Sequence, residues 1–150
     1  MEMFISNYLE WLEKLHTDFK SSFEGLPDAA LDWTPGDGMN SLAVLAVHTA
    51  GAERYWIGDV VIADPSERDR EAEFHTQGLD AQALKDRLDA SLEYARQNLA
   101  GLTLADLAAT RVSPRNGMQC TCGWAMLHAL EHIAQHTAHA QLTRQLWEQA

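Results

Sequence analysis

The sequence has few cysteines and few basic residues, and both shortages exclude classes of protein. Cysteine occurs only at Cys120 and Cys122. A separation of two residues makes them poor partners for a structural disulfide, so we expect two free thiols in a loop. Eleven Lys and Arg stand against 22 Asp and Glu, a formal net charge of -11. Such a chain repels phosphate backbones and anionic membranes, so we expect neither nucleic acid nor membrane as a partner.

Long apolar runs are also missing. The longest, Leu42 to Ala52, is interrupted by His48, Thr49 and Gly51. It is far shorter than the roughly 20 residues that a membrane-spanning helix needs. The first residues, MEMFISNYLEWLEKL, lack the basic start and apolar core of a secretory signal. We therefore expect a cytoplasmic protein.

The composition that is present is typical of one globular domain. Of the 150 residues, 46% are hydrophobic and 22% are charged, which is too apolar for a solvated coil. A chain of this length buries about two-thirds of the surface that its unfolded state exposes. We predict a single domain over residues 1–150, without internal repeats.

Four segments have the pattern of helices. Apolar residues recur every three or four positions in the first, Met3 to Phe23, and they are Phe4, Tyr8, Trp11, Leu12, Leu15 and Phe19. The second runs from Leu42 to Ile62 with Ser41 as its cap. The third begins at Asp80 and ends before Gly101, and the fourth runs from Gly123 to Trp147.

Gly and Pro separate these helices. Pro27 to Asn40 is predicted as a loop with a short helical turn at Asp28–Leu31. Ser66 to Gly78 is highly charged and is predicted as a solvated loop, and residues 102–121 show no sustained period. The pattern predicts an all-α fold, an up-down four-helix bundle with long connecting loops that can form the mouth of a site.

Histidine is the most informative residue type. Four of the seven histidines fall within twelve residues of the fourth helix: His128, His132, His136 and His139. At about 100° per residue they occupy an arc of about 80°. Leu142, Leu146 and Trp124 lie on or beside that arc, so we expect this face to point towards the bundle axis.

Neighbouring histidines on one helix face can share a metal ion. Three pairs are possible: His128 with His132, His132 with His136, and His136 with His139. A third ligand must come from another helix, and His48, midway along the apolar second helix, is the natural candidate. The alternative is a core in which histidines bond to one another, to carbonyls and to water, or act as a proton-linked switch.

Three neutral histidines suit a divalent transition metal, with zinc or nickel ahead of iron and manganese. Three protein ligands leave a position open for water, thiol or substrate, which is typical of a catalytic site. Tyr55 falls on the same helix face as His48 and is a candidate pocket residue. No catalytic general base is identified from the residues.

Two segments resemble the DinB/YfiT-like superfamily. Residues 41–56, SLAVLAVHTAGAERYW, resemble the family stretch "SL…L..HLAG.ERYW". Residues 124–140, WAMLHALEHIAQHTAHA, resemble its fourth-helix pattern, in which a His or Glu is followed four residues later by a His. The resemblance implies a four-helix bundle of the kind found in metal-dependent hydrolases and thiol S-transferases.

The resemblance also implies which residues bind the metal. Carried over, the triad is His48, His132 and His136, and the resemblance implies that His128 and His139 line the pocket or contact the ligand residues. His132 stands where the branch closest to mycothiol-dependent enzymes commonly has Glu. The implied function is an enzyme in which a metal-activated thiol or water attacks a small electrophilic substrate, as a thiol S-transferase or a hydrolase.

A second hypothesis is a non-catalytic bundle protein that binds a metal or a small molecule. The expected cofactors are a divalent metal ion, zinc or nickel, and a low-molecular-weight thiol. The expected partners are a small-molecule substrate and, because five tryptophans favour an aromatic pocket or a dimer face, a second copy in a homodimer.

Overall fold

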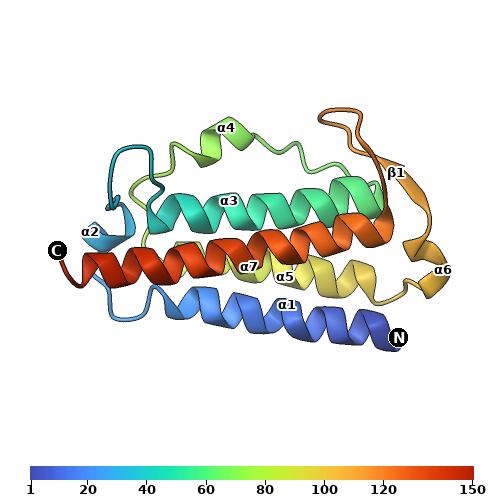
Figure 1. The fold of residues 1–150 in the computed structure, drawn as a ribbon, viewed down its shortest axis with the longest axis horizontal. Helices are drawn as coiled ribbons and strands as arrows, with labels where there is room; N and C mark the ends of the chain where they lie inside the picture. Colours follow the sequence, from blue (N-terminus) through green and yellow to red (C-terminus); the bar gives the residue numbers. More distant parts are fainter.

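The structure, a computed structural model that describes residues 1–150, is a four-helix bundle (Figure 1). The four long helical segments are α1 (Met3–Ser21), α3 (Leu42–Arg54) with its continuation η1 (Tyr55–Ile62), α5 (Ala81–Leu99) and α7 (Cys122–Trp147). α3 packs on α5 and α7, and α1 packs on the same two helices. The predicted all-α bundle with long connecting loops is confirmed.

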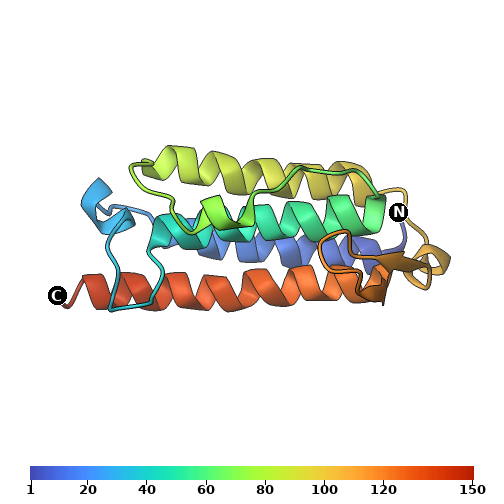
Figure 2. The same ribbon diagram turned by 90° about the horizontal axis from the view of Figure 1, so that it is seen from above.

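The connections determine the directions of the helices. α3 and α5 run the same way along the bundle, and α1 and α7 run the opposite way (Figures 1 and 2). The helices therefore do not alternate in direction throughout the chain, as the predicted up-down order requires. Residues 63–80, with the short helix α4 (Arg70–Glu73), therefore return along the length of the bundle before α5 begins. The remaining short elements are α2 (Asp28–Leu31), α6 (Leu104–Leu107), β1 (Thr110–Val112) and β2 (Gln119–Thr121).

Local sequence signals account for the helix starts. The Ser41 hydroxyl accepts the Val44 N–H, and the Asp80 carboxylate accepts the Ala83 N–H, as the capping pattern predicts. The Thr121 hydroxyl caps α7 through the Trp124 N–H. None of the helices is both long enough and apolar enough to span a membrane.

The second helix changes geometry after Arg54. Its predicted span, Leu42 to Ile62, is helical throughout, but Tyr55 to Ile62 forms a π-helix. It ends at Ala63, whose φ of 62° is in the left-handed region. A wider turn shifts side chains around the axis, so wheel angles at 100° per residue do not hold beyond Arg54.

The ambiguous stretch 102–121 forms a small hairpin before α7. β1 and β2 pair antiparallel, with Arg111 opposite Cys120. Both cysteines are free thiols, as predicted. The predicted loop position is wrong, because Cys120 lies in β2 and Cys122 is the first residue of α7.

The core consists of two apolar clusters separated by polar residues. One contains Leu12, Leu92 and Ile133 and the other contains Phe19 and Leu88, each with its neighbours. The buried polar residues between them along the four helices are His16, Glu53, Ser91 and Thr137. His16 Nε2 and Glu53 Oε2 lie 2.7 Å apart and connect α1 to α3.

The predicted inner face of α1 is partly wrong. Phe4 and Trp11 are 39% and 58% exposed, whereas Ile5, Leu9 and His16 are buried. The large apolar residues of α1 form a stripe wider than one core face. Ile5 and Leu9 fill the interior, so Phe4 and Trp11 are left at its edge.

Candidate metal centre

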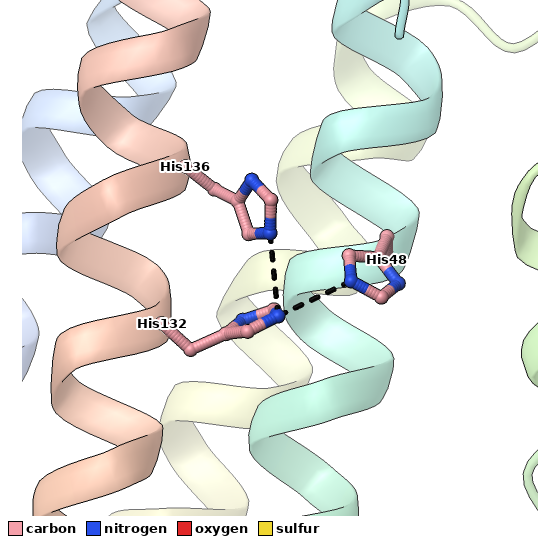
Figure 3. Close-up of side chains that lie close together, drawn as sticks. All are labelled: His48, His132 and His136. Atoms are coloured by element: carbon pink, nitrogen blue, oxygen red, sulfur yellow. Dashed lines mark hydrogen bonds between the residues drawn. The ribbon is translucent and has the colours of Figure 1, made fainter.

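Three histidine rings from two facing helices meet beside the core. His48 comes from α3, and His132 and His136 come from α7, one turn apart (Figure 3). His132 Nε2 lies 3.2 Å from His48 Nε2 and 3.2 Å from His136 Nε2. One nitrogen from each ring falls within 4.8 Å of the other two. The structure therefore brings together the three residues that the sequence singled out.

The histidine face of α7 does not point towards the bundle axis as predicted. Ala129, Ile133 and Thr137 turn inwards and are buried, while His132 and His136 are half-buried at the border between α7 and α3. Trp124 and Leu142, which share the predicted face, are 44% and 49% exposed. The helical-wheel prediction that the histidines share one face of α7 is correct. The face that packs inwards is instead the one that carries the small residues Ala129 and Thr137. The consequence is that solvent reaches two of the three rings.

Proximity and burial keep two of these rings neutral. Burial, followed by the nearby His136 and His48, lowers the pKa of His132 to about 3. Burial, followed by His48 and His139, lowers the pKa of His136 to about 4. Neutral imidazole is the form that binds a metal ion, and at neutral pH no proton has to be displaced from a positive ring.

The His48 ring is held by a carboxylate that the sequence analysis missed. Glu73 Oε2 lies 2.8 Å from His48 Nδ1. The carboxylate can only accept, so Nδ1 carries the proton and the Nε2 lone pair faces His132. Arg68 donates to both oxygens of Glu73, at 2.5 and 2.7 Å. Burial alone would raise the pKa of Glu73, but hydrogen bonds from Arg68 and His48 lower it below the ordinary value.

Both residues lie in Ser66–Gly78, which we predicted as a solvated loop. That prediction is wrong for these side chains, because the Arg68 and Glu73 side chains are only 9% and 7% exposed. The glycine at position 51 is consistent with this close packing, because a Cβ there would lie 2.1 Å from Glu73 Oε1. A glycine inside an Ala-rich helix indicates that another group approaches the backbone closely.

The other predicted pocket residues have different surroundings. The His139 Nδ1 lies 3.4 Å from the His136 Nδ1, so it is a partner for the far side of that ring. His128 stacks on Trp124, with ring centroids 5.0 Å apart, and borders His132 at 6.3 Å. The Tyr55 hydroxyl instead lies 2.7 Å from Ser113 Oγ, where it holds the loop before α7.

The donor set fits a metal ion. In a tetrahedral zinc site with Zn–N bonds of about 2.05 Å, ligand nitrogens lie about 3.3 Å apart. The two measured Nε2–Nε2 distances of 3.2 Å are close to that value. The Nδ1–H of a metal-binding histidine usually donates to a carboxylate or carbonyl, and His48 has this partner in Glu73. The three histidines could therefore hold one divalent ion with an open position.

Fold and site together define a four-helix-bundle protein with a candidate three-histidine metal centre between two helices. The family model of the DinB superfamily matches residues 12–140. This chain belongs to the DinB superfamily. No curated protein matches the sequence.

Two solved structures have the same fold. One is YfiT from Bacillus subtilis, described as "a probable metal-dependent hydrolase with an unusual four-helix bundle topology". It matches with a TM-score of 0.76 and 17% identity over 95% of this chain and 87% of that one. The other, a conserved protein from Enterococcus faecalis, matches with a TM-score of 0.74 and 19% identity over 97% of both chains. At these identities the likeness shows the fold.

Proposed function

We propose that this protein is a metal-dependent enzyme in which His48, His132 and His136 hold one divalent ion, zinc or nickel. In the proposed reaction a thiol or water attacks a small electrophilic substrate. The observation that carries the proposal is the convergence of one ring nitrogen from each of three histidines on α3 and α7, all within 4.8 Å of one another. The description of YfiT as a probable metal-dependent hydrolase supports the same class.

The chain prepares this site in three ways. Glu73 holds the His48 ring so that Nε2 faces the other two rings, and His139 occupies the far side of His136. The lowered pKa values of His132 and His136 keep both rings neutral above about pH 5. Their half-buried position leaves a route for substrate from the solvent. A metal ion held by these residues would lower the pKa of a bound water or thiol and would so supply a nucleophile near neutral pH.

The protein's own thiols are unsuited to the role of nucleophile. Burial is the largest cause that raises the pKa of both thiols, Cys120 and Cys122. Cys122 is only 1% exposed. A thiol S-transferase of this architecture therefore needs an external low-molecular-weight thiol. With water in its place, the same three histidines would serve a hydrolase.

A second candidate function is a metal-binding protein without turnover. Glu73 is the carboxylate that accepts a hydrogen bond from His48, and Arg68 and His48 together occupy both of its oxygens. It is therefore not free to act as a general base, which favours a binding role. Turnover of an electrophilic substrate by the metal-loaded protein separates the two candidates.

Elemental analysis of purified protein tests the metal centre. His48→Ala and His136→Ala should each lose most of the bound metal, because each removes one of three ligands. His75→Ala is the matched control, since His75 is exposed and bonds to a carbonyl in its own segment. Equal metal content in all three variants would contradict the proposal. A screen of several thiols against one electrophile, with and without a chelator, then separates transfer from hydrolysis.

A further inference from the structure

A cavity of about 590 Å³ borders the Glu73–Arg68 pair, and no histidine is among its lining residues. It lies between α3, α5 and the connection 63–80, and each of the three contributes lining residues. Its volume is within the range of small-molecule sites, about 300–1,000 Å³. It is therefore large enough for a ligand of modest size.

Small side chains keep this space open. The lining includes Ala50 and Gly51 from α3, Ala72 from α4 and Ala90 from α5. The connection packs closely against Gly51 through Glu73 and Arg68. Alanines on the facing elements are too short to fill the remaining space, so these parts of the wall are apolar and close to the backbone.

The polar groups of the lining leave one cation free. Arg54 pairs with Asp59 and Asp64, and Arg68 pairs with Glu73. The exposed Arg87 guanidinium forms no ion pair or side-chain hydrogen bond, although the chain as a whole is strongly acidic. An unpaired guanidinium at an apolar cavity favours a carboxylate or another planar anion.

One further charged group limits what fits. The Asp69 carboxylate also lines the cavity, where it accepts the Ala72 N–H that caps α4.

We propose that this cavity is a second binding site, which takes a small organic anion with an apolar body. Arg87 binds the anionic end, and the alanines of the lining contact the apolar body. The site is distinct from the three histidines. It shares Arg68 and Glu73 with them, so an occupant that contacts this pair also changes the environment of His48.

Benzoate is a suitable probe because it combines one carboxylate with a compact apolar ring, and benzamide is its uncharged counterpart. Titration of the metal-free wild-type protein, followed by ¹H–¹⁵N NMR, should shift the amides of Ala50, Ala72 and Ala90. The ring protons of His48 should shift in the same titration. Benzamide should bind at least tenfold more weakly. No shift at these amides, or equal binding of benzamide, would overturn the proposal.

Two variants test the assigned contacts. Arg87→Gln should weaken benzoate binding about tenfold, while Arg96→Gln, also on α5 but paired with Glu13, should not change it. Ala90→Leu adds bulk at an exposed position of the lining and should abolish binding at an unchanged melting temperature. Equal affinity in all of these variants would show that benzoate binds elsewhere. Because the metal is absent throughout, the result does not depend on the proposed function, whose failure is detected separately by elemental analysis.

Discussion

Glu73→Gln tests whether the connection between α3 and α5 determines the strength of the metal site. The substitution preserves the shape of the side chain and removes its charge. An amide can present its NH₂ group to His48 Nδ1 as readily as its oxygen, so the proton is no longer fixed on Nδ1. We expect the fraction of His48 with its Nε2 lone pair free for a metal to fall.

The expected size of the effect follows from the contacts of the ring. Loss of a carboxylate behind a ligating histidine weakens metal binding about 10–100-fold, or about 1.4–2.8 kcal/mol. The His48 ring also packs against Phe74, at a centroid distance of 4.7 Å, and is 7% exposed. These contacts remain in the variant, so we expect a loss near tenfold.

A competition titration of zinc against a chromophoric chelator at pH 7 measures this loss. Glu71→Gln is the control, because Glu71 is on the same short helix but its side chain is 82% exposed. Glu73→Gln alone leaves the Arg68 guanidinium unpaired, and the double variant Arg68→Gln/Glu73→Gln removes it. The double variant should regain the stability of the folded protein but not its affinity for zinc. If Glu73→Gln binds zinc as tightly as the wild type, the role assigned to Glu73 is wrong.

Three other predictions concern the same region. Gly51→Ala should weaken zinc binding as much as Glu73→Gln, because the new Cβ would lie 2.1 Å from Glu73 Oε1; Gly101→Ala, with open space around its Cβ, should leave affinity unchanged in the same titration. In the metal-free protein, the free energy of unfolding measured with urea should fall by about 1–2 kcal/mol as the pH is lowered from 7 to 5, because of His132. Its folded pKa of about 3 is below the ordinary 6.5, so its contribution is present above pH 6.5 and is lost as the pH falls towards 3; His132→Asn should flatten the dependence. Tyr55→Phe should lower the melting temperature by a few degrees through loss of the Ser113 bond, and a large loss of metal content instead would place Tyr55 in the site.

Much of the fold could be read from the sequence because its signals are local. Ser41 and Asp80 cap their helices through groups three residues away, and the periodic leucines of α5 form its buried face. The spacing of His132 and His136 placed both rings on one face of α7. Each of these features depends on residues within a turn or two of one another.

The features that escaped prediction depend on distant contacts. Arg68 and Glu73 are surrounded in sequence by charged residues, so nothing local distinguishes them from solvated neighbours. They are buried because Gly51 leaves room on α3 and because His48 offers a partner 25 residues away. Composition also gave no sign of the π-helix from Tyr55 to Ile62, whose turns differ from α-helical ones without a change in residue type.

Several expectations from the sequence remain predictions. They include the single domain over residues 1–150, the homodimer, the small-molecule substrate and the cytoplasmic location. Analytical ultracentrifugation would test the dimer directly. Trp11 and Trp124, which are 58% and 44% exposed, are two of the tryptophans on which that expectation was based.

The parallel course of α3 and α5 has a chemical consequence. In a bundle whose neighbours simply alternate in direction, a tight turn would join these two helices and would pass far from the middle of either. Here the connection must return beside α3, and it places the Glu73 carboxylate and the Arg68 guanidinium next to His48. A shorter connection would lack the two residues that orient the His48 ring. The parallel order of α3 and α5 and the orientation of this candidate ligand therefore depend on the same segment of chain.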